Sequence, residues 1–193
     1  MAEQLVRVFI SVSVPKEIVD IKEMLKSTVD AKGIKIRWVR NGSMHLTLKF
    51  IGNTTEKSID TINKTIHDAV KGMPVIDLSI SGTGCFSKGK KVNALWVGVK
   101  GEIEELKKLV VKIDNKLEPL GFPIEQRKYL PHITIARINN TQKNKLDISQ
   151  FINTTFTDLP MKIVKINLMQ SQSFSKGSFY TILGTHFLGT NLE

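Results

Sequence analysis

Hydrophobic residues recur with two different periods along the chain, and stretches of one period alternate with stretches of the other. Apolar side chains spaced three or four residues apart predict amphipathic helices, and runs rich in Val, Ile and Leu predict strands. The helices are expected over residues 16–29, 55–71 and 102–117, with a short helical segment near residues 145–152. The strands are expected over residues 5–14, 34–39, 45–52, 75–86, 92–100 and 132–138, and over a C-terminal hairpin of residues 163–174 and 179–187.

Tight turns between consecutive predicted strands indicate how the strands pair. Short stretches of Ser, Lys and Gly at residues 87–89 and 175–177 separate two such pairs of strands. Turns of this length join antiparallel neighbours. Helices interleaved with antiparallel hairpins favour an α+β fold over a doubly wound parallel sheet.

Two unrelated landmarks recur at nearly the same distance along the chain. A His-x-Thr pattern occurs at His45 and at His132, 87 residues apart (132 − 45), and the tetrapeptide FSKG begins at Phe86 and at Phe174, 88 residues apart (174 − 86). Two matches at one offset indicate an internal duplication. We expect a bilobal, pseudo-two-fold fold in which duplicated α+β units, with antiparallel sheets flanked by helices, meet at a central cleft. No linker-like stretch divides the chain, so residues 1–193 are expected to form one domain of two intertwined lobes.

Charge adds a class of partner to this picture. The chain carries 28 Lys and Arg against 18 Asp and Glu, a formal net charge of +10. This balance favours phosphate-bearing partners such as RNA or nucleotides; a lysine-rich surface that serves solubility alone is the alternative. A single cysteine, no signal-peptide pattern and no apolar run of about 18 residues favour a cytoplasmic protein without a membrane partner. The chain is expected to be a monomer with no obligatory protein partner.

The two His-x-Thr patterns supply candidate chemistry. Residues i and i+2 of a strand point to the same face, so His45 shares a face with Thr47, and His132 shares one with Thr134. If the halves are related by a two-fold axis, both pairs face one cavity. One imidazole can then take a proton from an attacking water while the other gives a proton to a leaving oxygen. The hydroxyls can hydrogen-bond phosphoryl oxygens. Each pattern by itself is also compatible with an ordinary polar strand position.

Metal binding is the alternative use of these histidines. Neither pattern has Cys, Asp or Glu at metal-ligand spacing, so a site without a metal or another cofactor is expected. The other two histidines, His67 and His186, have no twin at the repeat offset and are expected to be structural or solvated. Cys85 is expected to be a small core residue rather than a nucleophile.

At these motifs the sequence resembles a known family. "HLTLKF" and "PHITIAR" are similar to the paired signatures of the two-histidine phosphoesterases, and most similar to those of the RNA 2′,3′-cyclic phosphodiesterases, also called the 2′–5′ RNA ligase family. "RVFISVSVP" resembles that family's first strand and helix start, and "LWVGV" resembles its strand before the third helix. The resemblance spans nearly the whole chain.

The resemblance implies metal-independent hydrolysis of RNA 2′,3′-cyclic phosphate ends to 2′-phosphates, with reversible 2′–5′ ligation in some members. By the family pattern, His132 is the base that activates water and His45 is the acid, while Thr47 and Thr134 hold phosphoryl oxygens. Two further functions remain open. One is a non-catalytic RNA-binding module, and the other is a phosphodiesterase for a small cyclic phosphate or a 2′–5′ oligonucleotide.

Two more site residues follow from the same pattern. Phe50 and Arg137 each lie five residues after a motif histidine, where they can stack on a base and hold phosphate oxygens. Strict alternation places them on the opposite face, so a β-bulge must turn them if they act; a core phenylalanine and a surface arginine are the alternatives. Leu130 stands where many relatives have a basic residue, so the strength of substrate binding is in question. Lys88 and Lys176, at the hairpin tips, are either RNA contacts or plain turn residues.

Overall fold

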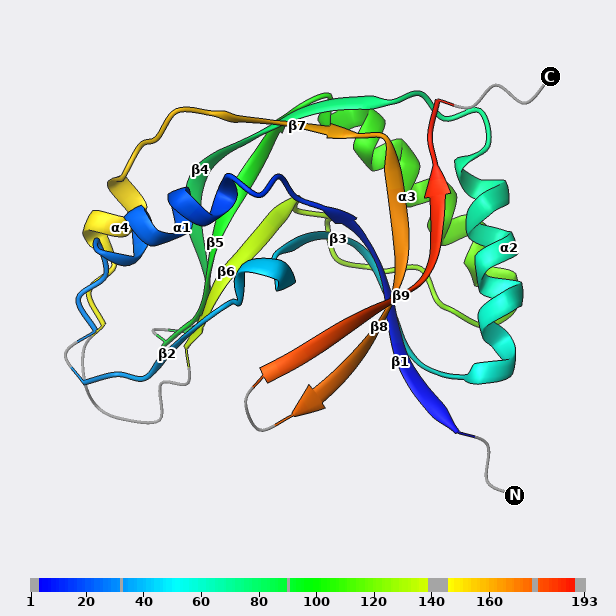
Figure 1. Cartoon of the computed structure of the whole chain (residues 1–193), viewed down its shortest axis with the longest axis horizontal. Coiled ribbons are helices and arrows are strands. Elements are labelled where there is room, and N and C mark those ends of the chain that lie inside the picture. The colour runs from blue at the N-terminus through cyan, green and yellow to red at the C-terminus, as the bar shows by residue number, and fades with distance from the viewer. Residues whose placement is uncertain (1–3, 32, 90, 139–145, 175–176, 190–193) are drawn as a thin grey trace.

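One curled antiparallel sheet forms the centre of the computed structural model (Figure 1). The structure describes residues 4–31, 33–89, 91–138, 146–174 and 177–189. Within these residues the sheet has nine strands, eight of them in the order β7-β4-β5-β6-β3-β1-β8-β9, while β2 pairs with β6. The strands are β1 (Leu5–Ser13), β2 (Ile36–Trp38), β3 (His45–Thr55), β4 (Ile76–Lys88), β5 (Lys91–Gly101), β6 (His132–Ile138), β7 (Leu159–Ile163), β8 (Lys165–Phe174) and β9 (Gly177–Phe187).

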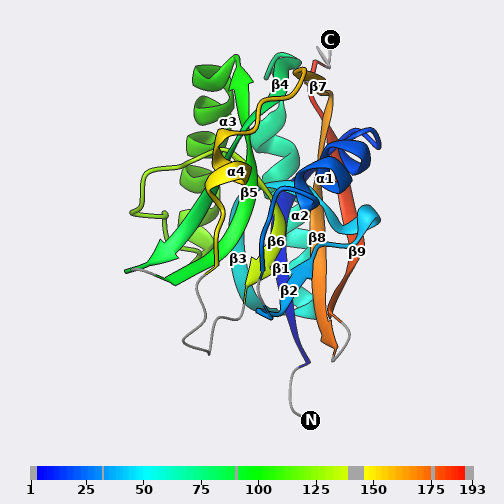
Figure 2. The ribbon, with the colours of Figure 1, turned by 90° about the vertical axis from the view of Figure 1, so that its left-hand side faces the viewer.

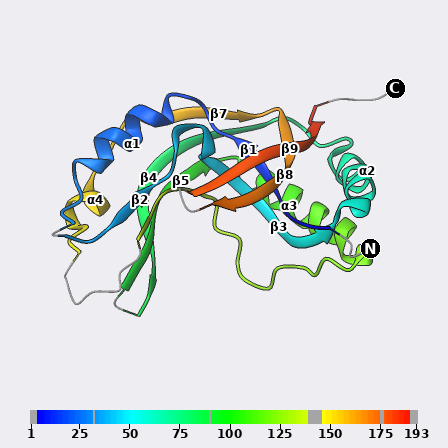
Figure 3. The same cartoon turned by 60° about the horizontal axis from the view of Figure 1, so that its bottom comes forward.

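The sheet is built alike on both sides of the β3–β6 contact. One arm continues through β5, β4 and β7, and the other continues through β1, β8 and β9. The first half of the chain contributes β1 and β3 to one arm but β4 to the other, and β8 from the second half joins β1. Each arm therefore contains strands of both halves. The two FSKG copies begin on the matching strands β4 and β8, although residues 175 and 176 of the second copy lie outside the described residues. Figure 3 shows the curl, with the β4–β5 pair and the β8–β9 pair on its two sides.

Helices flank the sheet on two sides of the molecule. On one side α2 (Ile59–Val70) packs against α3 (Ile103–Leu117), and on the other side lie α1 (Ile18–Lys26) and α4 (Ser149–Asn153) (Figures 1 and 2). Three 3₁₀ turns complete the described elements: η1 (Asn41–Ser43), η2 (Glu56–Ser58) and η3 (Glu118–Leu120). None of the helices in the described part of the chain is long and apolar enough to cross a membrane.

The apolar stripes of the helices and one face of the sheet form a common core. Each of the two long helices buries the residues that recur at helical spacing, which removes apolar surface from water and stabilises the fold. In α2 and α3 these buried apolar residues are Ile62, Ile66, Ala69, Val70, Leu106, Leu109, Val110, Ile113 and Leu117. Gly72, with a φ of 71°, lies just past the end of α2, where a residue with a side chain would be strained.

The predicted α+β fold is confirmed, with corrections to individual elements. The two sheets expected of a duplicated unit are joined into one through the β3–β6 contact. The predicted strand over residues 34–39 shortens to β2, and the short helix starts later than predicted, at Ser149; Lys145 lies outside the described residues. The strand β7 was not predicted. Its five residues contain Pro160 and lie on the edge of the sheet, where proline is tolerated but weakens the sequence signal.

Candidate active site

The site is organised around a single pair of residues at the middle of the sheet. Leu46 in β3 and Ile133 in β6 are antiparallel partners, and both are fully buried. The residues on either side of Leu46 and Ile133 along each strand point to the other face of the sheet. Antiparallel geometry therefore brings His45 toward Thr134 and Thr47 toward His132. The four side chains predicted from the repeat are all half-buried. The central residues of the two motifs are therefore strand partners, and this pairing brings the two His-x-Thr pairs together.

Each imidazole is oriented by its own hydrogen bond to a backbone carbonyl, and the two bonds are of the same kind. Nδ1 of His45 lies 2.8 Å from the carbonyl oxygen of Ser43, and Nδ1 of His132 lies 2.8 Å from that of Leu130. Because a carbonyl oxygen only accepts, Nδ1 of each ring is the donor. In the neutral ring Nε2 then has a free lone pair, and in the charged ring it has a proton to give. This is the arrangement that an acid–base pair requires.

The hydrogen bond to His132 shows what Leu130 contributes to the site. Its side chain is 48% exposed, and its contribution to the site is the backbone carbonyl that holds His132. Any residue at this position supplies that carbonyl, so the absence of a basic side chain leaves the orientation of His132 intact. The two neighbouring cations do not replace a basic residue in register. Arg127 is exposed and bound to Glu125 through Nη2 at 2.8 Å, and Lys128 is exposed.

Aromatic rings enclose each histidine in a similar way. Phe9 and Tyr180 pack on His45, with ring centroids 4.9 and 5.1 Å away. Phe86 and Trp96 pack on His132, at 4.7 and 6.1 Å. These four rings come from β1, β9, β4 and β5. Sequence reasoning did not assign them to the site, although Phe86 opens the first FSKG copy and Phe9 and Trp96 lie in the two segments that resemble the family.

The surroundings lower the pKa of both histidines. Burial is the largest cause for each ring, because it disfavours the charged form. The hydrogen bonds to Ser43 and Leu130 act in the opposite direction and raise the pKa. The positive charge of Arg137 lowers the pKa of both rings, and His132 lowers that of His45 further. Both imidazoles therefore favour the neutral form more than a free histidine does, and Arg137 lies close enough to influence both.

A β-bulge in each central strand turns the following residues toward the histidines. In β3, Thr47 pairs with Ser11 but Lys49 pairs with Ile10, which leaves Leu48 as the extra residue. In β6, Thr134 pairs with Trp96 but Ala136 pairs with Leu95, which leaves Ile135 as the extra residue. The two bulges lie 87 residues apart, at the repeat offset.

The bulges reverse the alternation beyond them. Phe50 is 64% exposed, and its ring lies 6.2 Å from that of Phe9, which contacts His45. Arg137 is likewise exposed and acts on the pKa of both histidines. The bulge that these two residues needed is thus present in both strands, and both lie on the histidine side of the sheet.

Trp96 leaves no room for a side chain at residue 84. A Cβ built on Gly84 would lie 2.2 Å from ring atoms of Trp96, and the indole Nε1 of Trp96 is buried with no partner among the described residues. We expect Gly84→Ala to displace the indole, which packs on His132, and to lower kcat/KM by about 10–100-fold, because small misplacements at a catalytic centre have effects of this order. Steady-state kinetics would measure the loss.

The matched control for this variant is Gly42→Ala. Residue 42 lies in η1, just before His45, and a Cβ there meets nothing within 4 Å. Its kcat/KM should stay within about twofold of the parent, since exposed substitutions rarely perturb structure. Equal activity in the two variants would show that the position of Trp96 does not matter for the site.

The remaining candidates lie outside the site. His67 is exposed on α2, and His186 is buried and hydrogen-bonded through Nε2 to Oδ1 of Asn63 at 3.0 Å, so both have the solvated or structural environments expected of them. Cys85 is half-buried against the core. Lys88 is exposed at the end of β4, and Lys176 lies outside the described residues. In the described part of the chain, no three or more His, Cys, Asp and Glu side chains are grouped so that they could hold a metal ion.

The fold and the paired histidines define a two-histidine phosphoesterase architecture. Residues 8–188 match the family model described as the AKAP7 2′5′ RNA ligase-like domain. The chain belongs to this family, which confirms the resemblance seen in its motifs.

Curated relatives and solved structures agree with this assignment. The RNA 2′,3′-cyclic phosphodiesterase of Aquifex aeolicus is 28% identical over 189 residues, which cover 96% of this chain and 99% of that protein. The protein of the same name from Methanothermobacter thermautotrophicus is 26% identical over 179 residues, covering 91% and 95%. The crystal structure of Escherichia coli LigT with 3′-AMP covers 97% of this chain and all of its own, with a TM-score of 0.77 and 18% identity. A Thermus thermophilus protein gives a TM-score of 0.78 at 20% identity, with 96% of this chain and 100% of its own covered. The two structures show that the fold is shared.

Proposed function

We propose that this protein is an RNA 2′,3′-cyclic phosphodiesterase that opens cyclic phosphate ends to 2′-phosphates. The observation that carries the proposal is the pair of histidines on one face of the sheet, each fixed through Nδ1 and each with Nε2 available. The relatives of that name match nearly the whole chain. The net charge of +10 suits a polyanionic substrate.

The reaction consumes one water and breaks one P–O bond. His132, neutral, takes a proton from the water as its oxygen attacks phosphorus. His45, protonated, gives its proton to the 3′ oxygen as the P–O3′ bond breaks. The products are a 3′ hydroxyl and a 2′-phosphate, and the proton taken up by His132 returns to solvent or to His45 before the next turnover. Each proton transfer contributes about 10²–10⁴-fold to the rate.

The other motif residues stabilise the charge that develops on phosphorus. The hydroxyls of Thr47 and Thr134 lie beside the histidines and donate to the non-bridging oxygens. Arg137 binds the same oxygens through its guanidinium, whose planar fork matches phosphate. Phe50, exposed beside Phe9, stacks on the terminal base. In 2′–5′ ligation a 5′ hydroxyl replaces water as the nucleophile, so that attack on phosphorus breaks the same P–O3′ bond and leaves a 2′–5′ linkage and a 3′ hydroxyl. The reverse of this step re-forms the cyclic phosphate and releases the 5′ hydroxyl.

Arg137 gives a pH-dependent test of this arrangement. Its charge lowers the pKa of both histidines, so Arg137→Gln is expected to raise both. The base limb and the acid limb of the bell-shaped kcat/KM profile should then both move to higher pH. The maximum itself should fall about 10–100-fold, the loss typical of one charge-assisted hydrogen bond.

Arg127→Gln is the control for charge alone, because Arg127 is exposed and already paired with Glu125. Its profile should keep its position. A profile of Arg137→Gln that stays in place or moves to lower pH would contradict the proximity of Arg137 to the catalytic histidines.

The function itself is tested with an RNA that ends in a 2′,3′-cyclic phosphate, incubated in excess chelator. Formation of a 2′-phosphate end supports the proposal. Tight binding of that RNA without turnover would favour the non-catalytic RNA-binding module, and turnover that chelator abolishes would contradict a metal-independent reaction. The proposal also takes residues 1–193 as one catalytic domain that acts as a monomer in the cytoplasm. One continuous sheet with each arm drawn from both halves supports the single domain.

A further inference from the structure

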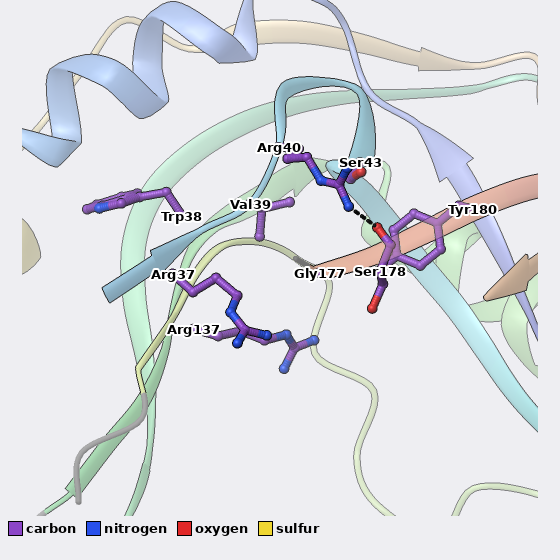
Figure 4. A pocket seen from close by; sticks show the side chains of 9 residues that line it. All are labelled: Arg37, Trp38, Val39, Arg40, Ser43, Arg137, Gly177, Ser178 and Tyr180. Atoms are coloured by element: carbon purple, nitrogen blue, oxygen red, sulfur yellow. Dashed lines mark hydrogen bonds between the residues drawn. The ribbon is translucent and has the colours of Figure 1, made fainter. Parts of the chain in front are cut away.

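Two arginines lie directly opposite one another beside the histidines. Arg37 in β2 and Arg137 in β6 are Cα partners in the antiparallel pair. Like charges in this position repel and destabilise a sheet. Among the described residues neither guanidinium forms an ion pair with a carboxylate. Figure 4 shows the two side chains extending to the same side, and both line one pocket. An uncompensated pair of this kind is suited to bind an anion between its two members.

The pair belongs to a pocket of about 90 Å³ with a third arginine in its wall. Arg40 is held in place by two contacts: its Nη2 donates to the carbonyl oxygen of Ser178 at 3.0 Å, and its guanidinium lies 4.0 Å from the centroid of the Phe179 ring. Its charge is therefore fixed at the edge of the pocket (Figure 4). Among the described residues, three arginines and no acidic side chain line the space, which makes it strongly positive.

The pocket adjoins the catalytic histidines. Ser43, whose carbonyl oxygen holds His45, lines it, and so does Tyr180, whose ring packs on His45 at 5.1 Å. Arg137 is shared, because it lines the pocket and also lowers the pKa of both histidines. A ligand with one phosphate between the histidines therefore has a second positive site directly beside it.

We propose that this pocket binds the 5′ phosphate of the nucleotide whose 2′,3′-cyclic phosphate lies between the histidines. The inference rests on the proposed function. A 2′,3′-cyclic phosphate ends the RNA chain, so the nearest other phosphate is the one on the 5′ oxygen of the same nucleotide. Arg37 binds its oxygens, Arg137 lies between the two phosphates, and the charge of Arg40 closes the far side. The preferred substrate is thus an RNA end, or a nucleotide with a 5′ phosphate, rather than a nucleoside 2′,3′-cyclic phosphate.

The experiment measures binding of two product-like ligands and does not depend on turnover. Dissociation constants of adenosine 2′-monophosphate and adenosine 2′,5′-bisphosphate are determined by calorimetry at low salt, where exposed charges are least screened. The parent protein is expected to bind the bisphosphate at least tenfold more tightly, as a hydrogen-bonded charge pair contributes about this much. Arg37→Gln should reduce that preference to about twofold, while its affinity for the monophosphate changes far less.

Lys116→Gln is the matched control, since it removes the same charge from an exposed position on α3, a helix with no residue among those that line the pocket. It should keep the parent's preference. Equal affinity of the parent for both ligands would overturn the proposal. Equal weakening of both ligands in Arg37→Gln would also overturn it, because Arg37 would then not be specific for the 5′ phosphate.

A turnover assay separates this inference from the function on which it rests. Adenosine 2′,3′-cyclic phosphate is compared with the same nucleotide carrying a 5′ phosphate, and kcat/KM is expected to be about tenfold higher for the second. Similar values for the two would contradict the subsite while leaving the phosphodiesterase activity established. If the protein turns over neither nucleotide and also fails to turn over an RNA that ends in a cyclic phosphate, the phosphodiesterase function is refuted. The role proposed for the pocket is then refuted with it.

Discussion

Replacement of either motif histidine by alanine is expected to lower kcat/KM by about 10²–10⁴-fold, the contribution of one proton transfer. Each ring is held by its own backbone bond, His45 to Ser43 and His132 to Leu130, so neither can take over the position of the other. The double variant should be little slower than the slower single variant, because the two groups act in one step and their effects are not additive. Product formation from a cyclic-phosphate-ended RNA, followed over time, measures all three.

His67→Ala is the control for loss of a histidine, since this residue is exposed on α2 and lies outside the site. Its kcat/KM should match that of the parent. Thermal unfolding of each variant separates a catalytic loss from a folding defect. A loss of less than about tenfold in either motif variant would remove that histidine from the acid–base pair.

The largest effect on stability is expected at a buried ion pair behind the site. Lys49 Nζ lies 2.5 Å from Asp114 Oδ1 and 2.8 Å from the carbonyl oxygen of Pro123, and the two charged side chains are only 3% and 8% exposed. Removing one member of such a pair leaves a buried charge without a partner and costs about 3–5 kcal/mol. Asp114→Leu is therefore expected to lower the free energy of unfolding by this amount. The melting temperature should fall by roughly 10 °C.

The pair also has a consequence for the site, because Lys49 follows the bulge at Leu48 and anchors it to α3. Asp114→Leu should therefore reduce activity as well as stability. The matched control is the double variant Lys49→Met with Asp114→Leu, which removes both charges and should recover most of the lost stability. Denaturant unfolding of the two single variants and the double variant gives the coupling between the residues. A single variant as stable as the parent would show that the pair is not needed.

Part of this site was predictable because its signals are local in the sequence. The i, i+2 spacing of His45 and Thr47 fixes their common face as soon as a strand forms, and the same holds for His132 and Thr134. The repeat offset predicted that the two pairs belong together, and the β3–β6 contact confirms that they meet. The helix stripes were equally readable, since apolar spacing alone determines which side of α2 and α3 is buried.

Other features depend on contacts between distant segments and could not be predicted in this way. Phe50 and Arg137 were proposed from the resemblance, but alternation placed them on the wrong face, and only the register of each central strand against its neighbour creates the bulges that turn them. Tyr180 reaches His45 only because the chain folds back on itself. The pairing of Arg37 with Arg137 joins residues 100 positions apart (137 − 37), and no local period marks it.

The sequence by itself determined the class of chemistry, through two histidines and two threonines repeated on strands, and it determined the helices and most of the strands. Only the tertiary structure decided how these parts act together: which nitrogen of each histidine is bound, which rings enclose it, where the strands bulge, and that a pocket lined by three arginines adjoins the site. The physical reason is one of range. Periodicity and spacing fix the direction of side chains within one element, whereas strand register, burial and the summed charge of a pocket arise from elements that are far apart in the chain.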